Sequence, residues 1–508
     1  MNFTSIEFAL FLPVVFVIYW LVLGRSLRGG NLWIVAASYL FYGWWDWRFC
    51  FLLAATTLVT FGCALPRRHR RWWCTASIVF NIATLILFKY FGFFGNGLRR
   101  LFEAVGWAMD WFTIDILLPV GISFYTLQAI SYSVDVYRRD IAPTRDLVAF
   151  AGFLSFFPQL VAGPIERSTQ LLPQFLKPRR WDYDRAVEGM RLILWGLLKK
   201  CAVADMLVCL VEPLWDSYAV DLPLHAAFSA VIAFAIQVYA DFSGYSDIAR
   251  GAAKLLGFEL MVNFRFPFFS RNLLEFWHRW HISLMEWFTR YVYIPLGGSR
   301  SGNRLVNVMI VFLLSGLWHG ANVCYVVWGA TCGLFYIATM LAGAQRHNPK
   351  KEEIGNRSNL WQMVLTFILF AIPMVFFRSP NLDIAITSYA RVGWKSGVLF
   401  ALMIGAAYVI SRVRMRFNFT AIFSVIVLLG AVCFWVRPDW FYTVFFLRRG
   451  MIMALLMFMV EWRARHLSFG LSIVPRRRWI RIAAYLALYL LIISSAAESD
   501  EPFLYFQF

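Results

Sequence analysis

The amino-acid sequence predicts an all-α protein that crosses a membrane many times. Of its 508 residues, 60% are hydrophobic and only 15% are charged, whereas soluble globular proteins are about half apolar and a quarter charged. Apolar runs of roughly 17–22 residues, long enough for a helix to span a bilayer, recur from one end of the chain to the other. The 23 Trp and 50 Phe fit a protein that meets lipid and its interfaces.

The apolar runs give the order of the expected helices. They are residues 6–24, 31–46, 49–65, 73–92, 116–134, 147–163, 188–211, 224–242, 305–319, 323–343, 360–377, 397–411, 418–436, 448–462 and 482–497. Since several are short or interrupted, we expect about 11–13 spanning helices and a few re-entrant or interfacial ones. Run 6–24 has no basic segment before it and no small-residue cleavage pattern after it, which favours a spanning helix over a cleavable signal. We expect residues 1–508 to form a single transmembrane domain.

The net charge of +19 comes from basic clusters in short loops. The clusters are residues 67–71, 412–416 and 476–478 with Arg481. Cytoplasmic loops of membrane proteins are rich in Lys and Arg, so these loops are expected inside, next to anionic lipid rather than nucleic acid. The N-terminus and the acidic segment 498–501 are then outside. The eight cysteines show no paired spacing and predict neither a disulfide framework nor a zinc site.

Residues 243–304 differ from the runs around them, because Gly, Arg, His and Pro are mixed with aromatic residues. Such a backbone persists at membrane depth only where protein buries it or where it lines a wet cavity. We therefore expect a re-entrant or interfacial, cavity-lining segment here, followed by helices at 305–343. If residues 273–291 form one helix, His281 faces the protein interior, while His278 and Glu275 face a polar boundary.

His319 is the strongest candidate for catalysis. It ends the uncharged run 306–318, and an ionisable side chain at membrane depth marks a functional site by default. Histidine moves protons near neutral pH, and a single histidine base needs an activated acyl group such as a thioester. Acyl transfer to a hydroxyl is therefore the expected reaction. Ser315 lies one turn earlier, but the chain has no GxSxG motif, which argues against a serine nucleophile. A purely structural helix contact is the alternative for His319, as a carbonyl contact is for His281.

The remaining polar candidates have weaker patterns. Residues 241–247 are expected to end an apolar helix, with Asp247 in the first turn of the next helix as a cap or a functional acid. Candidates for binding the acyl donor are Asn263, Arg265, Arg271 and His278, although the arginines also fit snorkelling to an interface. Glu275 and His278 have the spacing of half a di-iron ligand set, but such sites need a second copy, so no metal is expected.

Several longer motifs together resemble a known family. They are FPQLVAGPIER at 157–167, YADFSGYSD at 239–247, NFRFP at 263–267, EFWHRWHISL at 275–284, YVYIPLGG at 291–298, SGLWHGAN at 315–322 and PFLYFQF at 502–508. The chain resembles the membrane-bound O-acyltransferase superfamily and, within it, the bacterial alginate O-acetyltransferase group. The resemblance implies a ring of helices around a central tunnel, with His319 catalytic and His281 lining the same site.

The resemblance also implies a donor, partners and a location. The donor would be acetyl-CoA or another acyl thioester, used at a bacterial inner membrane. A periplasmic partner with an SGNH-hydrolase-like domain would pass the acetyl group to an exported polysaccharide. The alternatives are D-alanyl transfer from an acyl carrier protein and a non-catalytic transporter, although no internal repeat supports a transporter. His278 and Arg290 depart from the family's common FWRRWH and WFRDY, so the donor-facing surface is expected to differ there.

Overall fold

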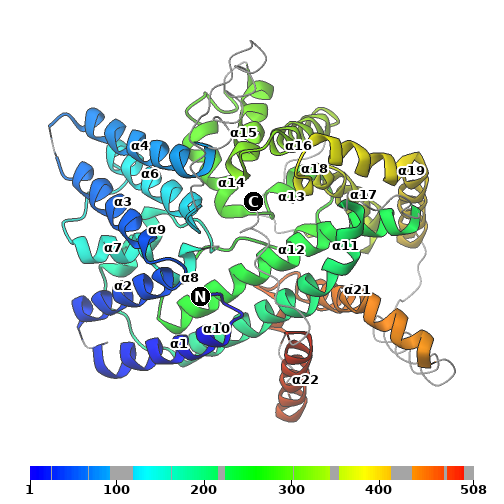
Figure 1. Ribbon diagram of the computed structural model, residues 1–508, viewed down its shortest axis with the longest axis horizontal. Helices are drawn as coiled ribbons and strands as arrows, with labels where there is room; N and C mark the ends of the chain where they lie inside the picture. Colours follow the sequence, from blue (N-terminus) through cyan, green and yellow to red (C-terminus); the bar gives the residue numbers. More distant parts are fainter. Residues whose placement is uncertain are drawn as a thin grey trace, which may run out of the picture.

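The computed structural model describes residues 1–23, 26–66, 68–91, 118–161, 163–215, 224–300, 303–343, 354–412, 438–473 and 477–496. Throughout these ranges the regular structure is helical and no strand occurs, which confirms the all-α prediction (Figure 1). The predicted span at 418–436, most of the basic cluster at 412–416, the acidic segment at 498–501 and the motif at 502–508 lie outside them.

The N-terminal helices gather on one side of the molecule, at the left of Figure 1. They are α1 (Ile6–Val17), α2 (Leu27–Gly43), α3 (Arg48–Ala64), α4 (Arg70–Leu85), α6 (Ile122–Arg138), α7 (Leu147–Ser155), α8 (Phe157–Leu160) and α9 (Ser168–Phe175). Two of them continue into wider π-helical turns, α1 into η1 (Ile18–Leu23) and α4 into η2 (Ile86–Tyr90). Aromatic side chains from these helices form much of a hydrophobic core on this side of the molecule.

Two long helices cross the middle of the molecule side by side (Figure 1). The first is α10 (Tyr183–Leu197), followed by the π turn η3 (Leu198–Ala204), the 3-10 turn η4 (Asp205–Leu207) and α11 (Val208–Trp215). The second is α12 (Leu224–Leu255). Glycines let their backbones approach closely, since a Cβ on Gly196 would lie 2.5 Å from the carbonyl oxygen of Gly244.

Short helices and irregular chain follow α12 and lead into the C-terminal helices. They are η5 (Pro267–Phe269), α13 (Leu273–Trp277), α14 (Ile282–Phe288), η6 (Thr289–Tyr293), α15 (Arg304–His319), α16 (Val323–Leu341), η7 (Arg357–Asn359), α17 (Leu360–Ala371), α18 (Met374–Arg378), α19 (Leu382–Arg412), α21 (Pro438–Ala464), η8 (Gly470–Ser472) and α22 (Arg478–Ala496). In Figure 1, α13 and α14 lie near the middle of the molecule, and α22 projects from its lower edge.

Within the described ranges, five helices are long and apolar enough to cross a membrane. They are Ile6–Leu23, Arg70–Tyr90, Val323–Leu341, Leu360–Arg378 and Arg478–Ser495. Shorter apolar helices occur at Arg48–Ala64, Leu147–Leu160 and Arg304–His319. The chain is thus an integral membrane protein, as predicted, whereas the expected total of 11–13 spans and the central tunnel stay predictions.

Two local expectations were wrong. Asp247 does not begin a helix, because α12 continues without a break through residues 239–247 to Leu255. Residues 273–291 do not form one helix either, since α13 ends at Trp277 and α14 begins at Ile282. His281 lies between them in the left-handed region, with φ of +43°. A non-glycine residue in that region costs about 1–3 kcal/mol and is concentrated at functional sites.

Hydrogen bonds to other parts of the protein hold the irregular chain after α12. The backbone N–H of Ile282 donates to the carbonyl of Asn263 at 2.9 Å, and that of Arg265 donates to the carbonyl of Arg279 at 3.0 Å. The N–H of Met261 donates to the Glu166 carboxylate at 2.6 Å. These bonds satisfy backbone groups that lipid cannot. They also fix the segment that delivers His281.

Candidate active site

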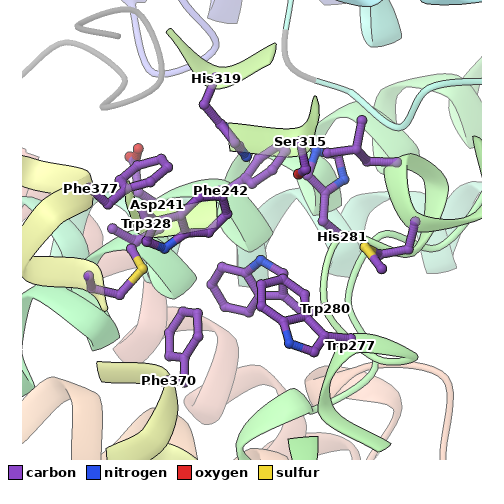
Figure 2. A pocket seen from close by; sticks show the side chains of 14 residues that line it. Asp241, Phe242, Trp277, Trp280, His281, Ser315, His319, Trp328, Phe370 and Phe377 are labelled. Atoms are coloured by element: carbon purple, nitrogen blue, oxygen red, sulfur yellow. The ribbon is translucent and has the colours of Figure 1, made fainter. Parts of the chain in front are cut away.

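A small, mostly aromatic pocket joins residues from helices far apart in the sequence. Its volume is about 40 Å³. The lining residues are Val238, Asp241, Phe242, Trp277, Trp280, His281, Leu284, Met285, Ser315, His319, Trp328, Phe370, Met374 and Phe377. Figure 2 shows the side chains of His319 and His281 reaching this space from different elements. The structure therefore brings the two histidines singled out in the sequence to one cavity.

His319 is the last residue of α15 and is 7% exposed. Close packing of α15 on α16 fixes its position, because a Cβ on Gly316 would lie 2.2 Å from the carbonyl oxygen of Tyr325. The imidazole meets the rings of Trp328 and Phe377 edge-on, with centroids 5.2 and 5.0 Å away. The predicted base thus lies against aromatic rings from α16 and α18.

His281 enters the pocket from the break between α13 and α14. It is 3% exposed, and the ring of Phe242 lies edge-on to it with centroids 4.7 Å apart. Among the described residues, neither ring nitrogen of His281 has a hydrogen-bond partner. Buried polar atoms are nearly always paired, so these nitrogens fit a site that a substrate completes. The expectation that His281 faces the interior is confirmed.

Asp241 is a third ionisable residue in the pocket lining, and the sequence analysis did not single it out. Its carboxylate pairs with the Lys200 ammonium at 3.0 Å, and Lys200 also pairs with Asp205 at 2.7 Å. All three residues are at least 91% buried. The signal was present, since an acid within the apolar run of α12 is costly without a partner.

A larger cavity of about 880 Å³ adjoins the pocket, because Trp277 and Met285 line both. Of the four candidate donor-binding residues, Arg265 and His278 line this cavity. Its other charged residues are Glu259, Arg279 and Glu286. A volume near the upper end of the usual range for ligand sites fits a cofactor-sized molecule.

Asn263 and Arg271 are not among the residues lining either cavity. The Asn263 amide accepts a hydrogen bond from Ser283 at 2.6 Å and donates one to Ser246 at 3.1 Å, so it joins α12 to α14. Arg271 pairs with the carboxylate of Glu275 at 3.0 Å. Both contacts hold the irregular segment in place.

Glu275 does not face a polar boundary, so that expectation was wrong. The residue is 1% exposed, and its carboxylate binds Arg271 and, at 3.1 Å, Arg279. Burial is possible because two guanidinium groups neutralise the charge. His278 is exposed, as expected.

The departure at position 290 has a structural role here. The Arg290 guanidinium pairs with Asp140 at 2.6 Å and with Asp135 at 3.5 Å. The Tyr291 hydroxyl donates to the same Asp135 at 2.8 Å. Arg290 thereby ties η6 to α6 and the loop after it.

The site thus combines two buried imidazoles in a small pocket with an adjoining larger cavity that has charged residues on its wall, inside a membrane protein. The model of the membrane-bound O-acyltransferase family matches residues 138–378. The chain is also 37% identical over 397 residues to the probable alginate O-acetylase of Pseudomonas putida, covering 75% of this chain and 78% of that protein. The chain therefore belongs to the membrane-bound O-acyltransferase family and is an O-acyltransferase.

Two further relatives differ in the chemistry their names describe. The peptidoglycan O-acetyltransferase of Helicobacter pylori is 31% identical over 412 residues, with 74% of this chain and 76% of that protein covered. The teichoic acid D-alanyltransferase of Streptococcus thermophilus is 26% identical over 288 residues, with 52% and 68% covered. The acetyl-transferring relatives thus match more of the chain at higher identity.

Proposed function

We propose that the protein moves an acetyl group from a cytoplasmic thioester to a hydroxyl group, for O-acetylation of an exported, alginate-like exopolysaccharide or cell-wall glycan. The observation that carries the proposal is the shared pocket of His319 and His281 beside the larger cavity. Acetyl-CoA, or another acyl thioester, is the donor. Among the described residues no group of three or more potential metal ligands occurs, and the mechanism uses none.

His319 acts as the general base. Its imidazole accepts the proton of the acceptor hydroxyl while the hydroxyl oxygen attacks the thioester carbonyl carbon. The C–S bond then breaks, and the departing thiolate takes the proton back from the imidazolium. The apolar rings of Trp328 and Phe377 keep water from competing with the acceptor. No net proton is gained or lost by the protein.

His281 orients and polarises the thioester carbonyl. One ring nitrogen carries a hydrogen in the neutral imidazole, and it is available to donate to the carbonyl oxygen as negative charge develops there. The left-handed backbone at this residue turns the ring out of the α13 direction and toward the pocket. The strain is compensated by the bonds that hold the neighbouring segment.

The larger cavity binds the body of the donor. Arg265 and His278, on its wall, would contact the phosphates of a coenzyme A thioester, and the acyl end would pass Trp277 and Met285 into the small pocket. The basic loops favour an orientation with the N-terminus outside, and we place this cavity on the cytoplasmic side because the thioester donor is cytoplasmic. Lipid surrounds the domain in a bacterial inner membrane.

The size of the small pocket favours acetyl over D-alanyl. D-alanyl is larger than acetyl by one carbon and one nitrogen, and its ammonium group is charged. A mostly aromatic pocket of about 40 Å³ suits the smaller, uncharged acetyl group better. D-alanyl transfer from an acyl carrier protein is the alternative, supported by the teichoic acid relative. A non-catalytic transporter does not fit an acyltransferase family member.

The final acceptor lies beyond the membrane. A periplasmic partner with an SGNH-hydrolase-like domain would receive the acetyl group and pass it to the polysaccharide. The names of the alginate and peptidoglycan relatives support a polysaccharide as the end of this route. The transfer itself needs only a hydroxyl in reach of His319.

The test uses purified protein in detergent with radiolabelled acetyl-CoA, with and without the candidate periplasmic partner. We expect label to be transferred by wild type and lost by at least about 10²-fold in His319→Ala, the usual contribution of a general base. His466→Ala, which removes an exposed histidine outside both cavities, is the matched control. Wild-type transfer by folded His319→Ala would refute the mechanism. Activity only with a D-alanyl carrier protein would favour the alternative.

A further inference from the structure

The C-terminal end of α15, which carries His319, is bound by two neighbouring side chains from another helix. The Lys89 ammonium donates to the carbonyl oxygens of Trp318 and His319, at 2.7 and 2.8 Å. The Tyr90 hydroxyl donates to the carbonyl of Leu317 at 2.5 Å. Both side chains come from η2, the π-helical turn at the end of α4. Such turns occur frequently at functional sites.

These bonds satisfy carbonyl groups at the C-terminal end of α15. The last four carbonyls of an α-helix have no partner inside the helix. Lys89 and Tyr90 satisfy three of them. A cation is also favoured where the negative end of the helix dipole lies, and charged donors make stronger hydrogen bonds than neutral ones. The end of α15 therefore favours a cationic donor at this place.

Lys89 also lies in an apolar helix, where burying a charged side chain costs free energy. It belongs to Arg70–Tyr90, one of the helices apolar and long enough to cross the membrane. Ionisable residues inside such segments are rare and usually functional. Besides the two carbonyls, the ammonium lies 5.9 Å from the centre of the Trp318 ring and 3.4 Å from the hydroxyl of Ser123. Its polar contacts thus converge on the end of α15 and on α6.

We propose that Lys89 is a positioning residue for catalysis, which fixes the backbone of His319 so that its imidazole meets the acceptor hydroxyl at the productive distance. One of its two bonds is made to the carbonyl of His319 itself. A displacement of about 1 Å at a reacting group can cost about 10²-fold in rate. The inference rests on the proposed role of His319 as the base.

The experiment compares kcat and KM for acetyl-CoA, per folded molecule, in Lys89→Met, Lys89→Gln, Lys89→Arg and wild type. Methionine keeps the length without the donors, glutamine keeps donors without the charge, and arginine keeps both. We expect kcat to fall by roughly 10–100-fold in the Met variant with KM changed by less than about twofold. Arginine should restore kcat to within about threefold of wild type. Lys177→Met, which removes an exposed lysine, is the matched control.

The outcomes separate this inference from the function it rests on. Glutamine, which keeps donors, should lose less kcat than methionine. Wild-type kcat in a folded Met variant would overturn the inference, as would a loss of folded protein with unchanged kcat per folded molecule. The latter result would mean that Lys89 only stabilises the fold. His319→Ala is measured in the same assay. If His319→Ala is inactive while Lys89→Met works normally, only the role of Lys89 fails; if His319→Ala is active, the proposed mechanism fails.

Discussion

The small pocket should limit the length of the acyl group that the protein transfers, and replacing Phe370 with alanine tests this limit. Phe370 is 2% exposed and lines the pocket opposite the end of α15 in Figure 2. Its ring packs on Phe276 and Trp280, with centroids 4.6 and 4.7 Å away. Because the pocket is only about 40 Å³, an acyl chain longer than acetyl is expected to press on the rings that line it, including Phe370 and Trp280.

The magnitude follows from the cost of misplacing one methylene. A rigid apolar pocket distinguishes substrates that differ by one methylene by about 1–3 kcal/mol, or roughly 10–200-fold in kcat/KM. Wild type should therefore use acetyl-CoA at least about tenfold better than propionyl-CoA. Phe370→Ala opens the pocket and should bring the two within about threefold. The same change should destabilise the protein by about 3–5 kcal/mol, as loss of a buried Phe usually does.

The assay measures kcat/KM for acetyl-, propionyl- and butyryl-CoA with one acceptor and with each preparation corrected for its folded fraction. Phe153→Ala is the control, because Phe153 is fully buried in α7 and lies outside both cavities. It should lose stability without changing acyl preference. Equal use of acetyl- and butyryl-CoA by wild type would refute the reasoning, and so would an unchanged preference in folded Phe370→Ala.

Two further predictions concern the segment between α12 and α15. His278→Ala should raise KM for acetyl-CoA about 3–10-fold with kcat unchanged. The reason is that its exposed imidazole lies on the wall of the larger cavity and away from the small pocket. Steady-state kinetics that show a fall in kcat alone would contradict this. Glu275→Gln should destabilise the protein by about 3–5 kcal/mol, since Arg279 is 5% exposed and would lose the carboxylate it pairs with. An unchanged Tm in detergent would show that this ion pair does not contribute to stability.

The sequence correctly predicted the positions of helices that periodicity or the length of an apolar run alone determines. The run 305–319 is α15, observed as Arg304–His319, and the run 323–343 is α16, observed as Val323–Leu341. Burial in lipid or protein forces the backbone of such runs to satisfy itself, so an apolar run of this length becomes a helix in nearly any context. The prediction failed where tertiary contacts replace the helical hydrogen bonds.

The segment around His281 shows that failure. Its sequence carries an aromatic stripe at helical spacing, yet the backbone breaks at residues 278–281 because Asn263 and Arg265 take up the hydrogen bonds of the neighbouring chain. Glu275 was misplaced for a related reason. Helical periodicity assigned it to a polar face, but two arginines neutralise it inside the protein. Pairs of that kind depend on partners that periodicity does not reveal.

The sequence by itself determined the membrane class, the order of the helices and the histidine that ends α15, because lipid permits few backbone structures and few ionisable side chains. It also placed His281 toward the interior. Only the tertiary structure decided that His281 and His319 share a pocket with Asp241, and that Lys89 binds the end of α15. Lys89 is 230 positions from His319. Contacts over such distances arise from the packing of whole helices, and no local pattern in the chain encodes them.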